Sequence, residues 1–406
     1  MDHRKNDDRR WGKRVRSIST WILPVGLALA VFLAAVADQD PAPCSSTISP
    51  GESIQAAIDA AADGAVLCLE PGTYEENLTI THAVTLRGLG ETLGEVEIKG
   101  ASKYDPGVVI LNPEGNAEPF TVAFENLTLS NRAPMKRHGI EVKGTATVTL
   151  RGVAVVGSEA YALILRDESR AEVVSSWIAE TKSGVGFNDA SQGLFVDSTL
   201  TDSQLKVGYT AVATFEGCDL SGSGFTVSGS AVMQAADTTF DRCRYPQIAS
   251  NAQATFANCS FWQLEGAIYV MGSAHLRLED CTLTEGYGGE SSHCTGLEVM
   301  DTASAEVVRC TFADNEEIAI QLRGSATLHL EDSQILRSGE LGLMTLCVDC
   351  ASRVWSASTV SDYYPESEEF VGQVTGSGNI IPGPGAPDAN VLGGVCPESL
   401  RFLTGS

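Results

Sequence analysis

The sequence has few basic residues: 27 Lys and Arg stand against 52 Asp and Glu, giving a formal net charge of −25. A nucleic-acid-binding protein needs a broad basic face, so this balance argues against that class. Charged residues make up only 19% of the chain and hydrophobic residues 43%, which excludes a disordered protein and a coiled coil. No phosphate-binding loop or G-x-S-x-G nucleophile motif stands out. The 40 glycines and only five tryptophans instead indicate many short strands and turns.

Long apolar runs are lacking too, except for one near the N-terminus. Trp21–Ala37 is a 17-residue apolar run that follows a basic segment. It is slightly short for a membrane-spanning helix, and a proline and a glycine interrupt it. Its last residues, Ala-Val-Ala, have the small-x-small form that precedes signal-peptide cleavage, here before Asp38. We therefore predict that residues 1–37 are a signal peptide or, if uncleaved, an N-terminal membrane anchor, and that the protein is secreted, periplasmic or at the cell surface.

All eleven cysteines lie in the part predicted to be exported, where oxidation is permitted. Cys44 and Cys68 bracket the first structural element, and we predict a disulfide between them. Cys347, Cys350 and Cys396 are predicted to supply a second bridge that holds the tail. The C-x-x-C spacing of Cys347 and Cys350 also suits half of a zinc site, but no second ligand pair follows, so we predict no metal. Because eleven is odd, at least one thiol is free or pairs with another molecule.

A repeat of about 22 residues dominates the rest of the chain. Aligning segments such as FEGCDL, FANCSF and LEDCTL produces a column of mostly small residues, with gaps of 20 to 29 residues. The column consists of Leu127, Val153, Ser176, Ser198, Cys218, Thr238, Cys259, Cys281, Cys310, Ser333 and Ser358. Apolar residues recur two positions after this column, and also 13 and 11 positions before it, as at Ile140 and Val142.

Two apolar positions separated by one variable residue indicate a strand with one buried face. A coil of this length with strands and no helix predicts an all-β parallel β-helix, a single solenoid of about 11–12 coils over residues 38–360. A leucine-rich repeat is the main alternative, but its Leu-rich frame with a fixed Asn is missing. We interpret the small-residue column as a packed ladder at a turn. Within it, Cys259, Cys281 and Cys310 are expected to be buried free thiols rather than a disulfide or a thiol–metal site.

The two ends of the repeat have features of caps. Residues 53–62 predict a short amphipathic helix that covers the first open coil, with Ser53 as N-cap and Gly64 as its stop. After the last repeat, residues 361–406 form a tail or cap rich in Gly and Pro.

The segment SPGESIQAAIDAAADGAVLCLEPGTYEENLTITHAVTLRGLG closely resembles the N-terminal cap and first coils of right-handed parallel β-helix proteins. This pectin lyase-like superfamily includes pectate lyases, alginate epimerases and NosD-like periplasmic proteins. The resemblance covers about residues 44–360 and implies a right-handed coil. It leaves function open, because the fold has catalytic and non-catalytic members. It also implies that substrate lies on one outward strand face, which we assign to the strands equivalent to Ile140–Val142.

Catalytic groups are sparse on that face. A polygalacturonase-like hydrolase needs paired carboxylates, and adjacent coils supply none. A lyase needs a base, for which Lys143, Arg166 and Lys206 are candidates, together with a cluster of Asp and Glu that binds calcium and is missing here. Calcium is therefore expected only if the protein is a lyase, and no other cofactor is expected. Copper delivery, which the NosD-like resemblance suggests, would need Met and His clusters that the sequence lacks.

One inserted turn carries a second set of acid/base candidates. Tyr287, Glu290 and His293 lie in the longest turn of the repeat, which resembles the active-site segment of alginate epimerases only at its two ends. We interpret them as weak catalytic candidates or as polar residues of an exposed loop.

The charge map favours binding. Residues 38–131 hold 3 basic and 15 acidic residues, residues 207–406 hold 8 and 25, and residues 132–206 hold 9 of each. In the neutral middle, Lys143, Arg166 and Lys206 are predicted to face outward over ~15 Å. They form a basic strip that binds an acidic polysaccharide, or they balance nearby acids. We predict an exported, non-catalytic protein that contacts a glycan or an envelope component through this strip. The alternative is a lyase or epimerase acting on uronate polymers.

Overall fold

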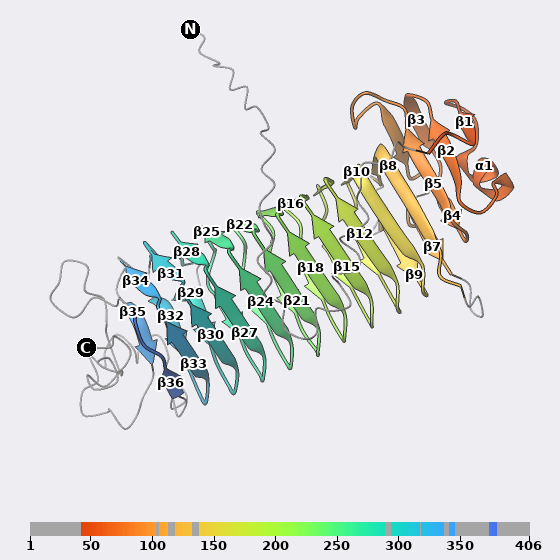
Figure 1. The fold of residues 1–406 in the computed structure, drawn as a ribbon. Coiled ribbons are helices and arrows are strands. Elements are labelled where there is room, and N and C mark those ends of the chain that lie inside the picture. Colours follow the sequence, from red (N-terminus) through yellow and green to blue (C-terminus); the bar gives the residue numbers. More distant parts are fainter. Residues whose placement is uncertain are drawn as a thin grey trace, which may run out of the picture. The chain divides into compact units, whose positions relative to one another are not determined.

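The computed structural model describes residues 42–102, 105–112, 118–131, 138–288, 294–316, 318–336, 341–345 and 373–379. The described residues from Cys44 onward form one compact unit. Within it, successive coils stack so that every strand pairs in parallel with the equivalent strand of the next coil (Figure 1). One short helix accompanies 36 strands among the described residues. The prediction of an all-β parallel β-helix is confirmed, and the 12 strands of one sheet give its number of coils.

Each complete coil contributes a strand to each of three stacks. The first two stacks join into a 24-stranded sheet, sheet A, and the third forms the 12-stranded sheet B. The strands of the first stack are β1 (Ser46–Ile48), β2 (Ala65–Leu69), β5 (Val84–Gly88), β12 (Arg170–Val174), β15 (Gln192–Val196), β18 (Val212–Glu216), β21 (Val232–Ala236), β24 (Gln253–Ala257), β27 (His275–Glu279), β30 (Ser304–Val308), β33 (Thr327–Glu331) and β36 (Gln373–Thr375). Two long strands span both stacks of sheet A: β8 (Thr121–Ser130) and β10 (Thr147–Val156).

The strands of the second stack are β3 (Gly72–Glu75), β6 (Val96–Lys99), β13 (Trp177–Ala179), β16 (Thr199–Thr201), β19 (Asp219–Ser221), β22 (Thr239–Asp241), β25 (Ser260–Trp262), β28 (Thr282–Thr284), β31 (Thr311–Ala313) and β34 (Gln334–Leu336). The strands of sheet B are β4 (Leu78–Ile80), β7 (Val108–Leu111), β9 (Ile140–Lys143), β11 (Tyr161–Leu165), β14 (Gly184–Phe187), β17 (Leu205–Val207), β20 (Phe225–Val227), β23 (Gln247–Ile248), β26 (Ile268–Val270), β29 (Cys294–Val299), β32 (Ile318–Leu322) and β35 (Leu341–Thr345).

The core lies inside the coil and is built by the predicted apolar columns. Leu163, Val185 and Leu205 pair in register on neighbouring strands of sheet B, and all three are fully buried. Side chains alternate between the two faces of a strand, so the residue that follows each of these three along its own strand lies on the outer face. The two-residue period of the sequence therefore fixed which residues are inside.

The small-residue column forms a ladder at the turn between the two stacks of sheet A. The residue before each described ladder position has a left-handed backbone, as at Asp197 with φ 47°. The ladder hydroxyl accepts a hydrogen bond from the backbone N–H of the preceding coil, for example Ser176 Oγ from Val153 N (3.1 Å) and Ser333 Oγ from Cys310 N (3.0 Å). A small side chain with an acceptor atom satisfies a buried N–H, which explains why Ser, Thr and Cys recur here.

The predicted helix caps the first coil. Helix α1 covers Ile54–Ala60, and Ser53 Oγ accepts from the N–H of Ala56 (3.1 Å), as an N-cap does. The Glu76 carboxylate accepts from the N–H of Ile54 (2.8 Å), where the positive end of the helix favours an anion. The helix is shorter than predicted because Ala61 is already extended and its N–H bonds to Ile58 O (3.0 Å).

The other end contains a strand within the predicted tail. Strand β36 pairs with β33, and Asn379 takes the ladder position above Ser333: its Oδ1 accepts from Ser333 N (2.9 Å). Ser358, which the repeat assigned to this column, lies outside the described residues.

The predicted disulfide between Cys44 and Cys68 is present, with Cα atoms 5.7 Å apart. The described ladder cysteines are free and buried, as predicted for Cys259, Cys281 and Cys310. Burial raises the pKa of the Cys218 thiol to about 11, so it stays protonated at neutral pH. Cys347, Cys350 and Cys396 lie outside the described residues.

Candidate functional site

The outer face of sheet B carries the predicted basic residues. Glu141, Ile164, Gly186 and Lys206 follow one another in register along this face, on β9, β11, β14 and β17. Lys143 and Arg166 lie in the neighbouring outward column, at the ends of β9 and β11. The three basic residues therefore share a face, with Lys206 three coils from Glu141, a distance of ~14 Å.

Two of the three basic residues bind one carboxylate instead of facing solvent alone. Glu141 contacts Lys143 Nζ at 3.2 Å and Arg166 Nε at 2.8 Å, and only 10% of its side chain is exposed. Strand alternation places Lys143 two residues after Glu141 on the same face, and coil stacking brings Arg166 beside it. Lys143 and Arg166 therefore fit the second interpretation of the strip, in which the basic residues balance a nearby acid.

Lys206 has a different neighbour. Its Nζ lies 6.0 Å from the ring centroid of Tyr161, within reach of a cation–π contact. The Tyr161 ring lies over Gly186, where a Cβ would come within 2.9 Å of it. The His138 ring packs on Tyr161 with centroids 5.6 Å apart. We call the set of His138, Glu141, Lys143, Tyr161, Arg166 and Lys206 the Tyr161 surface. Sequence reasoning missed Tyr161 because it precedes the aligned strand columns.

A second Glu–Arg pair repeats the first one nearer the C-terminal end of sheet B. Glu298 accepts from Arg323 Nη1 at 3.2 Å in the same register as Glu141 and Arg166. Burial raises the pKa of the Glu298 carboxyl despite this contact. At Glu141 burial acts the same way, but hydrogen bonds from Arg166 and Lys143 outweigh it and hold the pKa below its usual range. The two pairs differ at the residue two positions after the glutamate, which is Lys143 after Glu141 and Met300 after Glu298.

We expect Lys143→Met to raise the pKa of Glu141 and to reduce stability by about 1 kcal/mol at neutral pH, a modest cost because Lys143 is partly exposed. A carboxyl with a lowered folded-state pKa stabilises above its unfolded pKa, and this contribution is lost as pH falls through the folded pKa. The difference between variant and wild type should therefore shrink in acid. Urea midpoints across a pH series and carboxyl NMR titration measure it.

The reciprocal change, Met300→Lys, is the matched control, and it should lower the pKa of Glu298. Unchanged carboxyl pKa values in both variants would contradict the assignment of the difference to this position.

No described contact joins the candidates of the inserted turn, Tyr287, Glu290 and His293, to the Tyr161 surface. Tyr287 is 38% exposed, and its backbone forms a bridge with Glu265 between coils. Glu290 and His293 lie outside the described residues.

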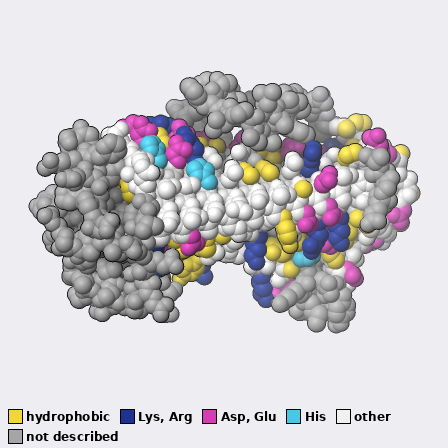
Figure 2. Space-filling view, turned by 90° about the horizontal axis from the view of Figure 1, so that it is seen from below, with side chains coloured by type: hydrophobic (Ala, Val, Ile, Leu, Met, Phe, Trp, Pro, Cys, Tyr) yellow, Lys and Arg dark blue, Asp and Glu magenta, His cyan; other side chains and the backbone are white. Residues whose placement is uncertain are grey.

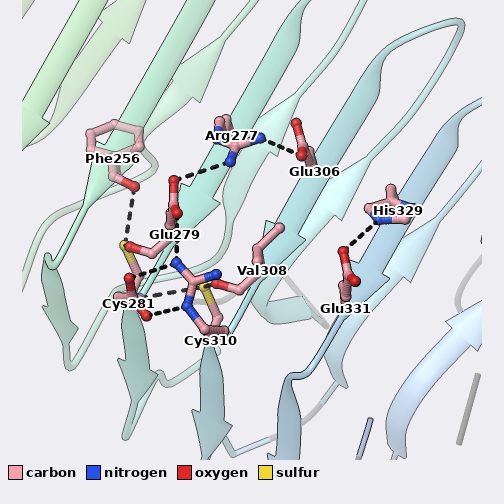
Figure 3. A network of polar contacts seen from close by, with 11 residues as sticks. Phe256, Arg277, Glu279, Cys281, Glu306, Val308, Cys310, His329 and Glu331 are labelled. Atoms are coloured by element: carbon pink, nitrogen blue, oxygen red, sulfur yellow. Dashed lines mark hydrogen bonds and ion pairs between the residues drawn. The ribbon is translucent and has the colours of Figure 1, made fainter. Parts of the chain in front are cut away.

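Sequence reasoning also missed a charged network on the first stack of sheet A (Figure 3). Arg277 lies between Glu279 and Glu306, and Arg309 binds both Glu279 and Asp280. Hydrogen bonds from Arg309 hold the pKa of both Glu279 and Asp280 low, so these carboxylates remain ionised. A general acid needs a raised carboxyl pKa, so we interpret the network as a link between coils rather than a catalytic pair. Its signal in the sequence is the pair of opposite charges at alternate positions of β27, Arg277 and Glu279, opposite Glu306 on β30.

Basic and acidic side chains are mixed on the face shown in Figure 2. Lys and Arg side chains lie beside Asp and Glu side chains there in two groups, one toward the upper left of the view and one toward the lower right. Among the described residues, no group of three or more His, Cys, Asp and Glu is placed to hold a metal ion. No helix in the described ranges is long and apolar enough to cross a membrane, and Trp21–Ala37 lies outside them.

These observations define a parallel β-helix protein with mixed-charge clusters on its outer faces. Comparison with known families agrees: residues 247–363 match the family described as "Right handed beta helix region". The predicted resemblance to right-handed parallel β-helix proteins is confirmed at the level of the fold. No curated protein matches the chain.

Several solved structures are similar to the chain. Pectin methylesterase PemA from Erwinia chrysanthemi is 13% identical with a TM-score of 0.35, covering 57% of this chain and 81% of its own. The GH87 α-1,3-glucanase catalytic unit from Streptomyces thermodiastaticus is 13% identical with a TM-score of 0.44, covering 85% and 70%. The Dettilon tailspike protein is 10% identical with a TM-score of 0.46, covering 75% and 69%.

Proposed function

We propose that this protein is a non-catalytic glycan-contact protein that binds an acidic polysaccharide of its envelope or surroundings through the Tyr161 surface. The observation that carries the proposal is the position of Lys206 over the Tyr161 ring. An aromatic ring offers a flat apolar surface to a sugar ring, and an adjacent ammonium group attracts a sugar carboxylate. The other two cations and Glu141 leave the surface with a net positive charge on an acidic protein, which favours an anionic ligand.

The contacts around Glu141 support a binding role over a lyase role. A lyase base must accept a proton from the substrate, whereas Lys143 and Arg166 both direct their donors to Glu141. Lys206 lies on a different coil and has no described carboxylate contact. These residues suit the recognition of a charged chain better than proton abstraction.

Export is part of the proposal. The Cys44–Cys68 disulfide supports an oxidising compartment, since such bonds are rare in the cytosol. We propose that the protein is secreted, periplasmic or at the cell surface. N-terminal sequencing of the purified protein distinguishes cleavage before Asp38 from a retained anchor.

Binding of the full chain to pectate and alginate, measured by affinity electrophoresis, tests the proposal. Lys206→Glu is expected to weaken binding about tenfold, because it replaces the attracting charge with a repelling one. Tyr161→Ala should also weaken binding. Lys99→Glu is the matched control, since this lysine lies on sheet A. Reversing the charge of Lys143 or Arg166 is a poorer test, because it would remove one of the two cations that contact the buried carboxylate of Glu141.

Equal binding by wild type and Lys206→Glu would remove the Tyr161 surface from the proposal. Incubation with the same polymers, with and without calcium, tests the absence of catalysis. The appearance of an unsaturated uronate product in the ultraviolet would establish the lyase alternative instead.

A further inference from the structure

The second stack of sheet A has an outer face unlike the others. Its strands from β13 to β28 are three residues long, and the middle residue of each is buried, as Leu200 is between Thr199 and Thr201. The flanking residues point outward and stack in register, for example Thr239 on Ser260 and Ser260 on Thr282. In Figure 1, β16, β22, β25 and β28 follow one another along one side of the coil. Two straight outward columns result.

These columns combine tryptophans with small hydroxyl and carboxylate side chains. We call them the tryptophan face, which consists of Trp177, Thr199, Thr201, Asp219, Ser221, Thr239, Asp241, Ser260, Trp262, Thr282 and Thr284. The six strands that carry it contain no Lys or Arg. The face is therefore polar and slightly acidic, with two large aromatic groups.

The two tryptophans are exposed although they are large. Trp177 is 42% and Trp262 is 40% exposed. Removing an exposed indole ring from water is favourable, so a ligand that covers the ring gains hydrophobic free energy of binding. Four coils separate them, a distance of ~19 Å along the axis. Each is thus placed to contact a different unit of one extended ligand.

A neighbouring side chain orients the Trp177 ring. Trp177 Nε1 lies 3.4 Å from Thr201 Oγ1 on the next coil, so the indole leans across the face. Trp262 pairs in register with Asp241 on one side and Thr284 on the other. A ring that lies across a strand face offers a broad apolar surface, and such rings contact apolar groups with little loss of side-chain freedom.

The groups between the tryptophans match a ligand rich in hydroxyls. Thr and Ser hydroxyls both donate and accept hydrogen bonds, and carboxylates accept them. Asp241 Oδ1 is buried and has no hydrogen-bond partner within the described part of the chain, although Arg242 Nη2 contacts Oδ2 at 2.9 Å. Because Oδ1 is buried, we expect the ligand hydroxyls to pair with the exposed side chains of Asp219, Thr239 and Thr282 instead. An anionic ligand would instead meet the carboxylates of Asp219 and Asp241, and the neighbouring Arg242 is already paired with Asp241.

We propose that the tryptophan face binds a neutral polysaccharide chain that lies along the axis of the coil. Two sugar rings stack on Trp177 and Trp262, and hydroxyls of the intervening units pair with the Thr, Ser and Asp side chains between them. This site is separate from the Tyr161 surface, which is on sheet B and is proposed to bind acidic chains. The two proposals therefore fail independently.

Binding of the full chain to neutral polysaccharides tests this site. The probes are laminarin, xyloglucan and soluble starch, with pectate for comparison, and the readouts are affinity electrophoresis and tryptophan fluorescence. Trp177→Ala and Trp262→Ala are each expected to weaken binding of a neutral probe roughly tenfold, as aromatic anchors do. The double variant should abolish measurable binding, while pectate binding is unchanged.

Two further variants separate contact from folding. Tyr209→Ala is the matched control, because Tyr209 is 65% exposed in a turn away from this face. This variant should leave the binding of neutral polysaccharides unchanged. Thr239→Arg places a bulky cation between the two tryptophans without altering either ring, and it should weaken neutral binding. Far-ultraviolet circular dichroism of every variant should match wild type.

Three results would overturn the proposal. The first is that no neutral probe binds the wild type. The second is equal neutral binding by the wild type and the double tryptophan variant. The third is self-association, measured by analytical ultracentrifugation, that the double variant loses without any polysaccharide being bound, since the face would then join copies of the chain.

Discussion

Phe240→Ala is expected to lower the free energy of unfolding by about 3–5 kcal/mol, the usual cost of removing a buried phenylalanine ring. Phe240 is fully buried at the centre of an aromatic cluster inside the coil. Its ring stacks on Phe261 with centroids 4.6 Å apart and an interplanar angle of 9°. It also meets Phe256 edge-on at 5.4 Å and Phe225 at 5.6 Å. Its loss removes contacts in its own coil and between coils.

The coil architecture makes this change more damaging than its local cost. Each repeat of a solenoid is stabilised mainly by its two neighbours, so a weak coil in the middle separates the stack into two parts. Urea denaturation followed by circular dichroism measures the effect. Thr239→Ala is the matched control, because Thr239 precedes Phe240 but points outward, and its effect should stay within about 0.5 kcal/mol. Equal midpoints for Phe240→Ala and Thr239→Ala would show that the cluster does not stabilise the coil.

Cys44→Ala is expected to destabilise the N-terminal end by about 3–4 kcal/mol, the chain-entropy contribution of a cross-link across a loop of this length. The two cysteines are 24 residues apart, and the bond ties the chain before β1 to β2. Cys44 is exposed and Cys68 is fully buried, so replacing Cys44 removes the bond with the smaller change in packing. The effect should concentrate in β1, α1 and β2, since distant coils do not touch them.

Hydrogen exchange of the amides in these elements measures the loss. A reductant supplies the control: it should bring wild type to the level of Cys44→Ala and leave the variant unchanged. Equal protection of β1 and β2 in both proteins, with and without reductant, would contradict a stabilising role for the bond.

The repeat predicted the coil because its rules are local. Alternation along a strand places Leu163 and Leu165 on the same buried face, and this depends only on their spacing. The left-handed turn before Ser198 likewise requires only that a small side chain with an acceptor atom follows it. The cap was equally accessible, since Ser53 and the apolar positions Ile54 and Ile58 identify a short amphipathic helix. These features depend on neighbours in the sequence.

The candidate sites were only partly predictable, because their chemistry depends on which coils lie side by side. Lys143 and Arg166 were expected to face outward, and they do, but their shared partner Glu141 became evident only from the contacts across two coils. The pairing of Lys206 with Tyr161 crosses coils in the same way. Long side chains choose partners by distance and burial, and a repeat pattern specifies neither.

The sequence by itself determined that this protein is a parallel β-helix with a helical cap and a Cys44–Cys68 disulfide, since periodicity and spacing specify strands, turns and ends. Only the tertiary structure decided how its surfaces are composed. Stacking in register placed Trp177 and Trp262 in the two outward columns of one face and brought Arg166 to Glu141 on another. The physical reason is that turns of unequal length separate the coils in the sequence, while backbone hydrogen bonding between coils brings the same positions to a constant spacing.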